Sequence, residues 1–167
     1  KVPMGRAGDN ARALDLAGGP FDLALTSPPY LNGTNYFRNT KLELWFLGWL
    51  SSESELRNYR NLTVAGGIND VGGDREVRYR IPSADRVAEQ LEATDGDRRI
   101  ARLVRLYLSY MYEVFRSVHG ALRPGGRFVL DIGDSKFYGV HVPTDSLLGD
   151  AAKEVGFTVE DMIVLAR

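Results

Sequence analysis

The sequence has 167 residues, of which 44% are hydrophobic and 26% are charged, with a net charge of −1 and no cysteine. This length and composition suit one ordinary globular domain with a buried core, and the near-zero charge gives no overall basic field for nucleic acid. The lack of cysteine excludes disulfides, thiolate metal sites and cysteine nucleophiles. No apolar run is long enough to span a membrane, and the first residues given do not have the basic-then-apolar pattern that a signal peptide would show. We therefore expect a cytoplasmic protein that uses neither a metal nor a membrane.

The first predicted strand follows a short helix. Residues Asn10 to Leu16 can form two helical turns, and Gly18-Gly19-Pro20 would end them. Phe21 to Thr26 is a short apolar run that is typical of a buried parallel strand. The run Ser27-Pro28-Pro29-Tyr30 then follows the strand directly.

The stretch after the proline-rich loop changes character halfway. Lys41 to Leu50 is strongly apolar and predicts a helix, with Trp45 and Trp49 in the core. The region 51–99 is rich in glycine, arginine and acidic residues, and its periodicity is broken. It predicts an insertion or a mobile excursion within a single domain that spans 1–167.

A long amphipathic helix comes next. Apolar residues recur there at helical spacing: Ile100, Leu103, Val104, Tyr107, Tyr110, Met111, Val114, Phe115 and Val118. Gly120 can cap this helix, and 123–126 forms a turn before a second buried strand over 127–132. A helix over 143–155 and a third strand over 157–165 follow. Strands that alternate with helices predict a parallel α/β sheet.

The proline-rich loop would lie at the carboxyl ends of the strands, where open α/β sheets bind ligands. A peptide before proline lacks an N–H, and the residue before proline is extended, so Ser27 Oγ and the Pro28 carbonyl can offer two acceptors side by side. Tyr30 adds a flat aromatic face. This set suits a planar ring that carries an amino group. Accepting both amino hydrogens localises the nitrogen lone pair and stabilises the positive charge that develops when nitrogen attacks an electrophile.

At this point the residues resemble a known family. "TSPPY" is similar to the catalytic motif (Asp/Asn/Ser)-Pro-Pro-(Tyr/Phe/Trp) of S-adenosylmethionine-dependent methyltransferases that act on exocyclic amino groups of DNA bases. The serine version looks most like the N4-cytosine enzymes, and some N6-adenine enzymes overlap with it. "AGDNARAL", "LRPGGRFVLDIGD" and "GVHVPTDSLLGDAAKEVGF" resemble further segments of these enzymes in the expected order, over about two-thirds of the chain.

The resemblance implies an α/β, three-layer, Rossmann-like class I methyltransferase fold with a mainly parallel sheet. It implies S-adenosyl-L-methionine as cofactor and duplex DNA with a flipped base as partner, often within a restriction-modification system. The implied catalytic residues are Ser27, Pro28, Pro29 and Tyr30. The implied cofactor-binding residues are Asp9, Asn10, Ser27 and Asp131. The glycine-rich cofactor loop of the family is absent from this sequence, so we expect a partial, incomplete catalytic domain.

The candidates around the loop also have structural interpretations. Asp9 either binds a ribose or amino group of the cofactor or caps the helix that follows it. Asn32, Asn35 and Tyr36 either line the pocket of the target base or stabilise their own loop.

Later candidates are equally open. Arg78 and Arg80 in "REVRYR" either contact DNA phosphates or form a solvated surface with the surrounding acids. Asp131 and Asp134 follow the second strand and either approach the ligand or cap a turn. His141 has no visible partner in the sequence and is expected to be structural or exposed.

The leading hypothesis is therefore methyl transfer to cytosine N4 in DNA. Methylation at cytosine C5 is excluded because it needs a cysteine nucleophile. N6-adenine is the nearest alternative, and RNA bases or a glutamine amide are more distant ones. A non-catalytic module that binds nucleic acid or a partner chain is the rival from another class.

Overall fold

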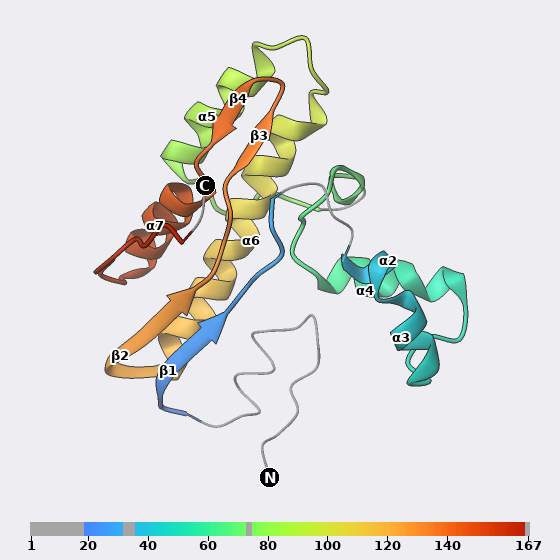
Figure 1. Cartoon of the computed structure of the whole chain (residues 1–167), viewed down its shortest axis with the longest axis horizontal. Helices are drawn as coiled ribbons and strands as arrows, with labels where there is room; N and C mark the ends of the chain where they lie inside the picture. The colour runs from blue at the N-terminus through green and yellow to red at the C-terminus, as the bar shows by residue number, and fades with distance from the viewer. Residues whose placement is uncertain (1–18, 32–35, 73–74, 166–167) are drawn as a thin grey trace.

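The structure is a computed structural model, and it describes residues 19–31, 36–72 and 75–165 (Figure 1). Strand β1 (Phe21–Thr26) pairs in parallel with β2 (Leu122–Leu130). Both strands carry the β-branched and large apolar side chains that favour a pleated surface. The strand predicted at 21–26 and its parallel pairing are confirmed. The prediction that both strands are buried is wrong: no residue of β1 or β2 is fully buried, because only one face of the pair is covered. The helix predicted at 10–16 lies outside the described residues.

The turn predicted at 123–126 lies inside strand β2, as the register of the strand pair shows. Phe21 pairs with Leu122, but Leu23 already pairs with Arg127, so the four residues 123–126 form an irregularity within β2. Gly125 has a φ of +76°, a left-handed value that glycine adopts without steric cost. The regular part of β2 begins at Arg127, as predicted.

Helix α6 (Arg99–Ala121) is the central element of the fold. Its apolar stripe is buried as the spacing predicts, and it contains several of the most buried side chains of the described residues: Leu103, Val104, Leu106, Tyr107, Leu108, Met111 and Phe115. Gly120 lies inside the helix, so its prediction as a cap is wrong. The chain leaves α6 through Leu122 with φ −83° and ψ 144°, which is extended backbone that requires no glycine.

Two further helices pack on α6. Helix α5 (Pro82–Glu92) begins with a proline, which fits the first helical turn because its missing N–H has no partner there. Helix α7 (Thr144–Val155) is followed by Gly156, which caps its end with a left-handed φ of +112°. The helix predicted at 143–155 is therefore confirmed. Helix α5 lies within 51–99 and places Ala84, Ala88 and Leu91 in the core; that 51–99 is an insertion stays a prediction.

A short antiparallel hairpin was not predicted. Strands β3 (Ser135–Phe137) and β4 (Val140–Val142) are joined by Tyr138 and Gly139, with φ of +49° and +83°. Positive φ at both loop residues is what a type I′ hairpin turn requires. Each strand is three residues long, too short for a periodic signal.

The third predicted strand, over 157–165, is wrong because no strand forms there. Its apolar end is exposed: Ile163 is 78% and Leu165 85% accessible. A strand needs a neighbour for its hydrogen bonds, and the described residues offer none to this segment. The structure is therefore a mixed α/β fold with a small parallel pair of strands, and it does not show a Rossmann fold.

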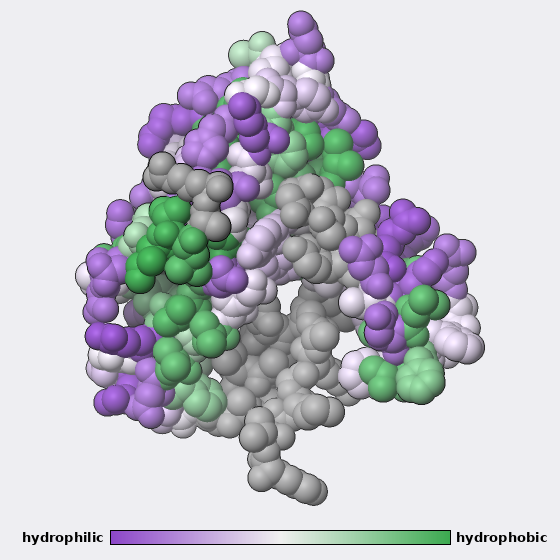
Figure 2. Space-filling model, in the orientation of Figure 1, coloured by the Kyte–Doolittle hydropathy of each residue, from purple (hydrophilic) through white to green (hydrophobic). Residues whose placement is uncertain are grey.

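The strand pair has one covered face and one open face. Phe128 and Leu130 lie on the side that packs on α6, whereas Leu23, Leu25 and Val129 are exposed on the other side. Figure 2 shows this apolar surface over the strand pair and over the C-terminal segment. The described residues thus supply a helical layer and a sheet layer, and no third layer.

A group of short helices projects from the side of the fold (Figure 1). It contains α2 (Tyr36–Asn39), α3 (Lys41–Phe46), the 3-10 turn η1 (Glu53–Glu55) and α4 (Leu56–Leu62). The 3-10 turn η2 (Ile68–Asp70) is not part of this group, because it packs against α6.

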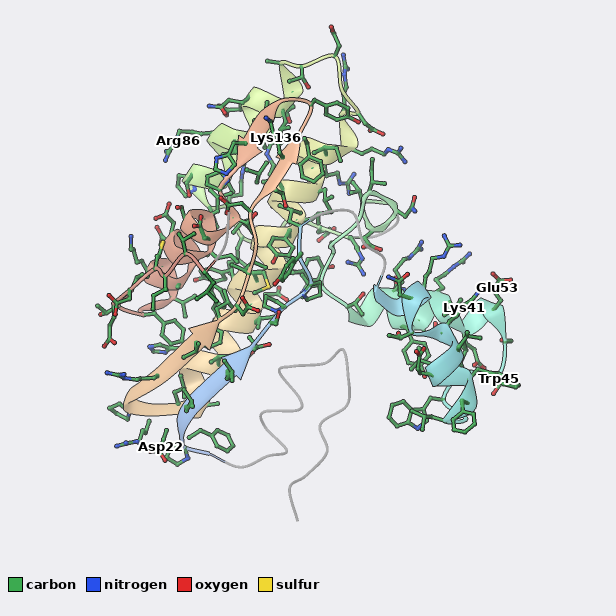
Figure 3. The ribbon with its side chains drawn as sticks, in the orientation of Figure 1. Asp22, Lys41, Trp45, Glu53, Arg86 and Lys136 are labelled. Carbon is green, nitrogen blue, oxygen red and sulfur yellow. The ribbon has the colours of Figure 1, made fainter. Side chains whose placement is uncertain are left out.

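The prediction that Trp45 and Trp49 are core residues is wrong. They are 65% and 55% exposed, and Figure 3 shows Trp45 pointing away from the rest of the fold. Helix α3 is only six residues long and has no buried residue, because no large element of the described chain covers its apolar face.

Candidate functional site

The parallel pairing brings two predicted segments together at one edge of the sheet. Thr26 pairs with Leu130, and the Thr26 carbonyl accepts a hydrogen bond of 3.0 Å from the Asp131 N–H. The proline-rich loop and the segment 131–134 therefore leave the sheet side by side. This confirms that both lie on the rim where the strands end.

The loop is anchored to the fold through the carbonyl of Pro29 and through that of Leu31, the residue that follows the loop. The Tyr107 hydroxyl of α6 donates a hydrogen bond of 2.9 Å to the Pro29 carbonyl. The Ser135 hydroxyl of β3 donates to the carbonyl of Leu31, a residue that is fully buried. Since α6 and β3 both belong to the packed part of the structure, the loop is tied to its rigid elements.

The remaining groups of the loop are differently exposed. Ser27 is exposed, Pro28 is buried and Tyr30 is half-buried. Among the residues that the structure describes, none forms a hydrogen bond with Ser27 Oγ or the Pro28 carbonyl. A Cβ atom on Gly133 would lie 3.4 Å from Cε2 and 3.6 Å from Cδ2 of Tyr30, so the backbone after β2 runs along one edge of this ring. The structure thus brings the tyrosine and the second rim segment into contact.

His141 has a partner that the sequence did not reveal. Its Nε2 lies 2.8 Å from Asp134 Oδ2, and Asp134 Oδ1 accepts a hydrogen bond of 3.3 Å from the Asp145 N–H. Burial opposes ionisation of Asp134, but the hydrogen bonds from His141 and Asp145 outweigh it and lower the pKa of Asp134 below its usual value. His141 is exposed, as expected, and Asp134 joins the rim segment to the hairpin.

The arginines of "REVRYR" lie elsewhere. The backbone N–H groups of Arg78 and Tyr79 donate to Ser109 Oγ of α6, at 2.9 Å and 3.1 Å. Ser109 is two residues from Tyr107, which is about 200° around the helix, so this segment lies on the side of α6 opposite the proline-rich loop.

Both arginine side chains already have acidic partners. Arg78 lies 3.3 Å from Glu113, and Arg80 makes two hydrogen bonds of 3.0 Å with Asp85. The structure does not bring these arginines to the loop, and their contact with DNA stays a prediction.

The other candidates are divided between the rim and the undescribed residues. Asp131 is exposed on the rim. Asp9, Asn10, Asn32 and Asn35 lie outside the described residues, and Tyr36 begins α2. In the described ranges, no group of three or more histidine and acidic side chains is placed to hold a metal ion. No helix within those ranges combines the length and apolarity of a membrane span.

Sequence comparison gives distant relatives of one kind. The chain is 24% identical over 160 residues to the type II methyltransferase M.AvaI of Nostoc sp. (strain PCC 7120 / SAG 25.82 / UTEX 2576). This alignment covers 87% of this chain and 32% of the relative. The type II methyltransferase M.AvaI of Anabaena variabilis aligns with the same identity and coverage. The chain therefore spans about a third of the length of the curated relatives it matches.

Two other comparisons found nothing. No family model matches the chain, and no solved structure matches it. The comparisons thus establish a distant similarity to type II methyltransferases, and they determine no target base.

Two residues of the site were missed by sequence reasoning. Tyr107 was assigned only to the apolar stripe of the long helix, and Ser135 was not singled out. A tyrosine on the core side of a helix must find an acceptor for its hydroxyl, and a loop that contains two prolines carries carbonyls in need of donors. That complementarity was a usable signal for Tyr107.

Proposed function

We propose that this chain is part of a DNA methyltransferase that transfers a methyl group from S-adenosylmethionine to the exocyclic amino group of a flipped base, with cytosine N4 as the target. The observation that supports this most strongly is the position of Ser27-Pro28-Pro29-Tyr30. This loop lies at the carboxyl end of β1, beside the end of β2, and hydrogen bonds from α6 and β3 anchor it. The distant similarity to type II methyltransferases agrees with it.

In this proposal the loop prepares the amino nitrogen for attack. Ser27 Oγ and the Pro28 carbonyl accept its two hydrogens, which draws the nitrogen lone pair out of the aromatic ring. The same two acceptors stabilise the positive charge that nitrogen acquires as it forms the new bond. Tyr30 holds the base by stacking after it has left the duplex. The surplus proton on nitrogen then passes to solvent.

The rim partly suits the cofactor. Asp131 is an exposed carboxylate next to Ser27 on the rim, and a carboxylate accepts hydrogen bonds from hydroxyl or amino groups such as those of S-adenosylmethionine. The proposal assigns Asp131, Ser27, Asp9 and Asn10 to cofactor binding. When bound, S-adenosylmethionine would supply an electrophilic methyl group, and its sulfur would leave with the electron pair of the broken carbon–sulfur bond. Among the described residues, no glycine-rich turn after a strand completes that site.

Duplex DNA is the proposed partner, and a cytoplasmic restriction-modification system is the proposed setting. Asn32, Asn35 and Tyr36, which follow the loop closely, are assigned to the pocket of the base. Arg78 and Arg80 are assigned to phosphates, which requires that they exchange their acidic partners for DNA. N6-adenine remains the alternative target, since the chemistry of the amino group is the same.

The test uses the complete gene product with radiolabelled S-adenosylmethionine and mixed-sequence duplex DNA. We expect label in the DNA from the wild-type protein and from Tyr30→Phe, which keeps the ring. Ser27→Ala and Tyr30→Ala are expected to lose the activity, while Ser54→Ala, a matched change at an exposed serine, is expected to keep it. No transfer by a wild-type protein that binds the cofactor would refute a DNA substrate. Failure to bind the cofactor would favour the non-catalytic binding module.

A further inference from the structure

Tyr107 is a buried tyrosine with its hydroxyl turned to a loop 78 residues earlier in the sequence. Its side chain has no exposed surface, and it lies among apolar neighbours of the core such as Leu103 and Met111. Its hydroxyl donates to the Pro29 carbonyl at 2.9 Å. A phenylalanine would fill the same space, so packing alone does not explain a hydroxyl at this position.

The bond acts on a loop that has few free torsions. The ring of proline locks φ near about −65°, so the direction of the Pro29 carbonyl depends on one remaining soft angle, the ψ of Pro29. A single hydrogen bond to that carbonyl therefore sets this angle. The next peptide unit carries Tyr30, so the same bond orients the tyrosine relative to Pro28.

The anchors also divide the acceptors of the loop. Tyr107 donates a hydrogen bond to the Pro29 carbonyl, and Ser135 donates one to the Leu31 carbonyl, so the two anchored carbonyls lie on either side of Tyr30 in the sequence. Among the described residues, none donates a hydrogen bond to Ser27 Oγ or to the Pro28 carbonyl. The acceptors bound by the fold are thus separate from those assigned to the amino group.

We propose that Tyr107 is a positioning residue for methyl transfer: its hydroxyl holds the Pro29 carbonyl and thereby fixes Tyr30 against the acceptors that precede it. This inference rests on the proposed function. Tyr107 acts through the loop and does not itself touch the substrate. Its loss loosens the geometry of the reacting groups while it leaves the binding surface in place.

The test compares Tyr107→Phe with Tyr112→Phe in the complete gene product. Tyr112 lies on the same helix and stacks on Tyr79 with ring centroids 4.3 Å apart. We expect Tyr107→Phe to lower kcat for methyl transfer roughly ten- to hundredfold, as small misplacements of reacting groups do, with little change in the KM for S-adenosylmethionine. Tyr112→Phe is expected to keep both constants. An unchanged kcat in a folded Tyr107→Phe protein would overturn the proposal.

A second readout is independent of activity. Amide hydrogen exchange at Tyr30 and Leu31 is expected to become roughly tenfold faster in Tyr107→Phe and to stay unchanged in Tyr112→Phe. Ser135→Ala, which removes the other anchor, is expected to act in the same direction and serves if Tyr107→Phe does not fold. Unchanged exchange in the folded Tyr107→Phe variant would overturn the anchoring. A wild-type protein without transferase activity would overturn the proposed function instead, and with it the catalytic role of Tyr107.

Discussion

Replacing Phe115 with alanine removes the ring that α6 packs against the strand pair. Phe115 is 1% exposed, and its ring meets that of Phe128 in β2 edge to face, with centroids 5.4 Å apart and planes at 80°. Phe128 in turn lies 5.6 Å from the ring of Phe157. A fully buried phenylalanine cut to alanine loses its transfer free energy and leaves a cavity, which costs about 3–5 kcal/mol. We expect the free energy of unfolding to fall by an amount in this range, because Phe115 is almost fully buried and its ring contacts Phe128 of β2.

The assay is equilibrium urea unfolding of the protein, with Phe46→Ala as the matched control. Phe46 lies on α3 and is 83% exposed, so its replacement is expected to change the free energy of unfolding by less than about 0.5 kcal/mol. A loss below about 1 kcal/mol for Phe115→Ala would refute its place in a well-packed core. If the two variants lost the same free energy of unfolding, the apolar face of α3 would be covered rather than exposed.

Three further predictions concern the framework of the site. Ser109→Ala leaves the two amides of 78–79 without their acceptor and is expected to cost about 1–3 kcal/mol in urea unfolding; no loss would contradict the anchoring of this segment. Gly156→Ala, at a φ of +112°, is expected to lower the thermal midpoint by a destabilisation of about 1–2 kcal/mol; an unchanged midpoint would speak against the left-handed cap of α7. A hydrogen bond from Arg105 lowers the pKa of Glu92 in the folded protein below its usual value of 4.5. The pair therefore stabilises the fold above pH 4.5, and this stabilisation is lost as the pH falls through the lowered pKa of the folded state. Glu92→Gln is expected to flatten the acid side of the stability–pH curve, and a curve identical to that of the wild type would contradict this.

Local patterns predicted the elements whose burial depends on one nearby partner. The apolar stripe of α6 was readable because its spacing matches 3.6 residues per turn, and β1 was readable as a short apolar run that follows the turn residues Gly18-Gly19-Pro20. The same signal failed at Trp45, Trp49 and the third strand. Apolar residues there indicate a need for cover, but they do not say which element supplies it, and the described residues supply none.

The site was predictable in the same partial way. Parallel strands must end at one edge, so the neighbourhood of the proline-rich loop and the 131–134 segment followed from the order of elements. The contacts of Tyr107 with Pro29 and of Ser135 with Leu31 join residues 78 and 104 positions apart. Such pairs depend on how α6 and the hairpin pack, which no local pattern specifies.

Identifying the nucleoside that receives the methyl group tests the central claim most directly. Duplex DNA labelled by the complete gene product is digested to nucleosides and separated against standards of N4-methylcytosine, N6-methyladenine and 5-methylcytosine. We predict label in N4-methylcytosine, abolished by Ser27→Ala and by Tyr30→Ala. Label in N6-methyladenine would keep the role of the loop and correct the base. Label in 5-methylcytosine, or transfer that survives both substitutions, would contradict the assignment of Ser27-Pro28-Pro29-Tyr30 as the site of amino-group methylation.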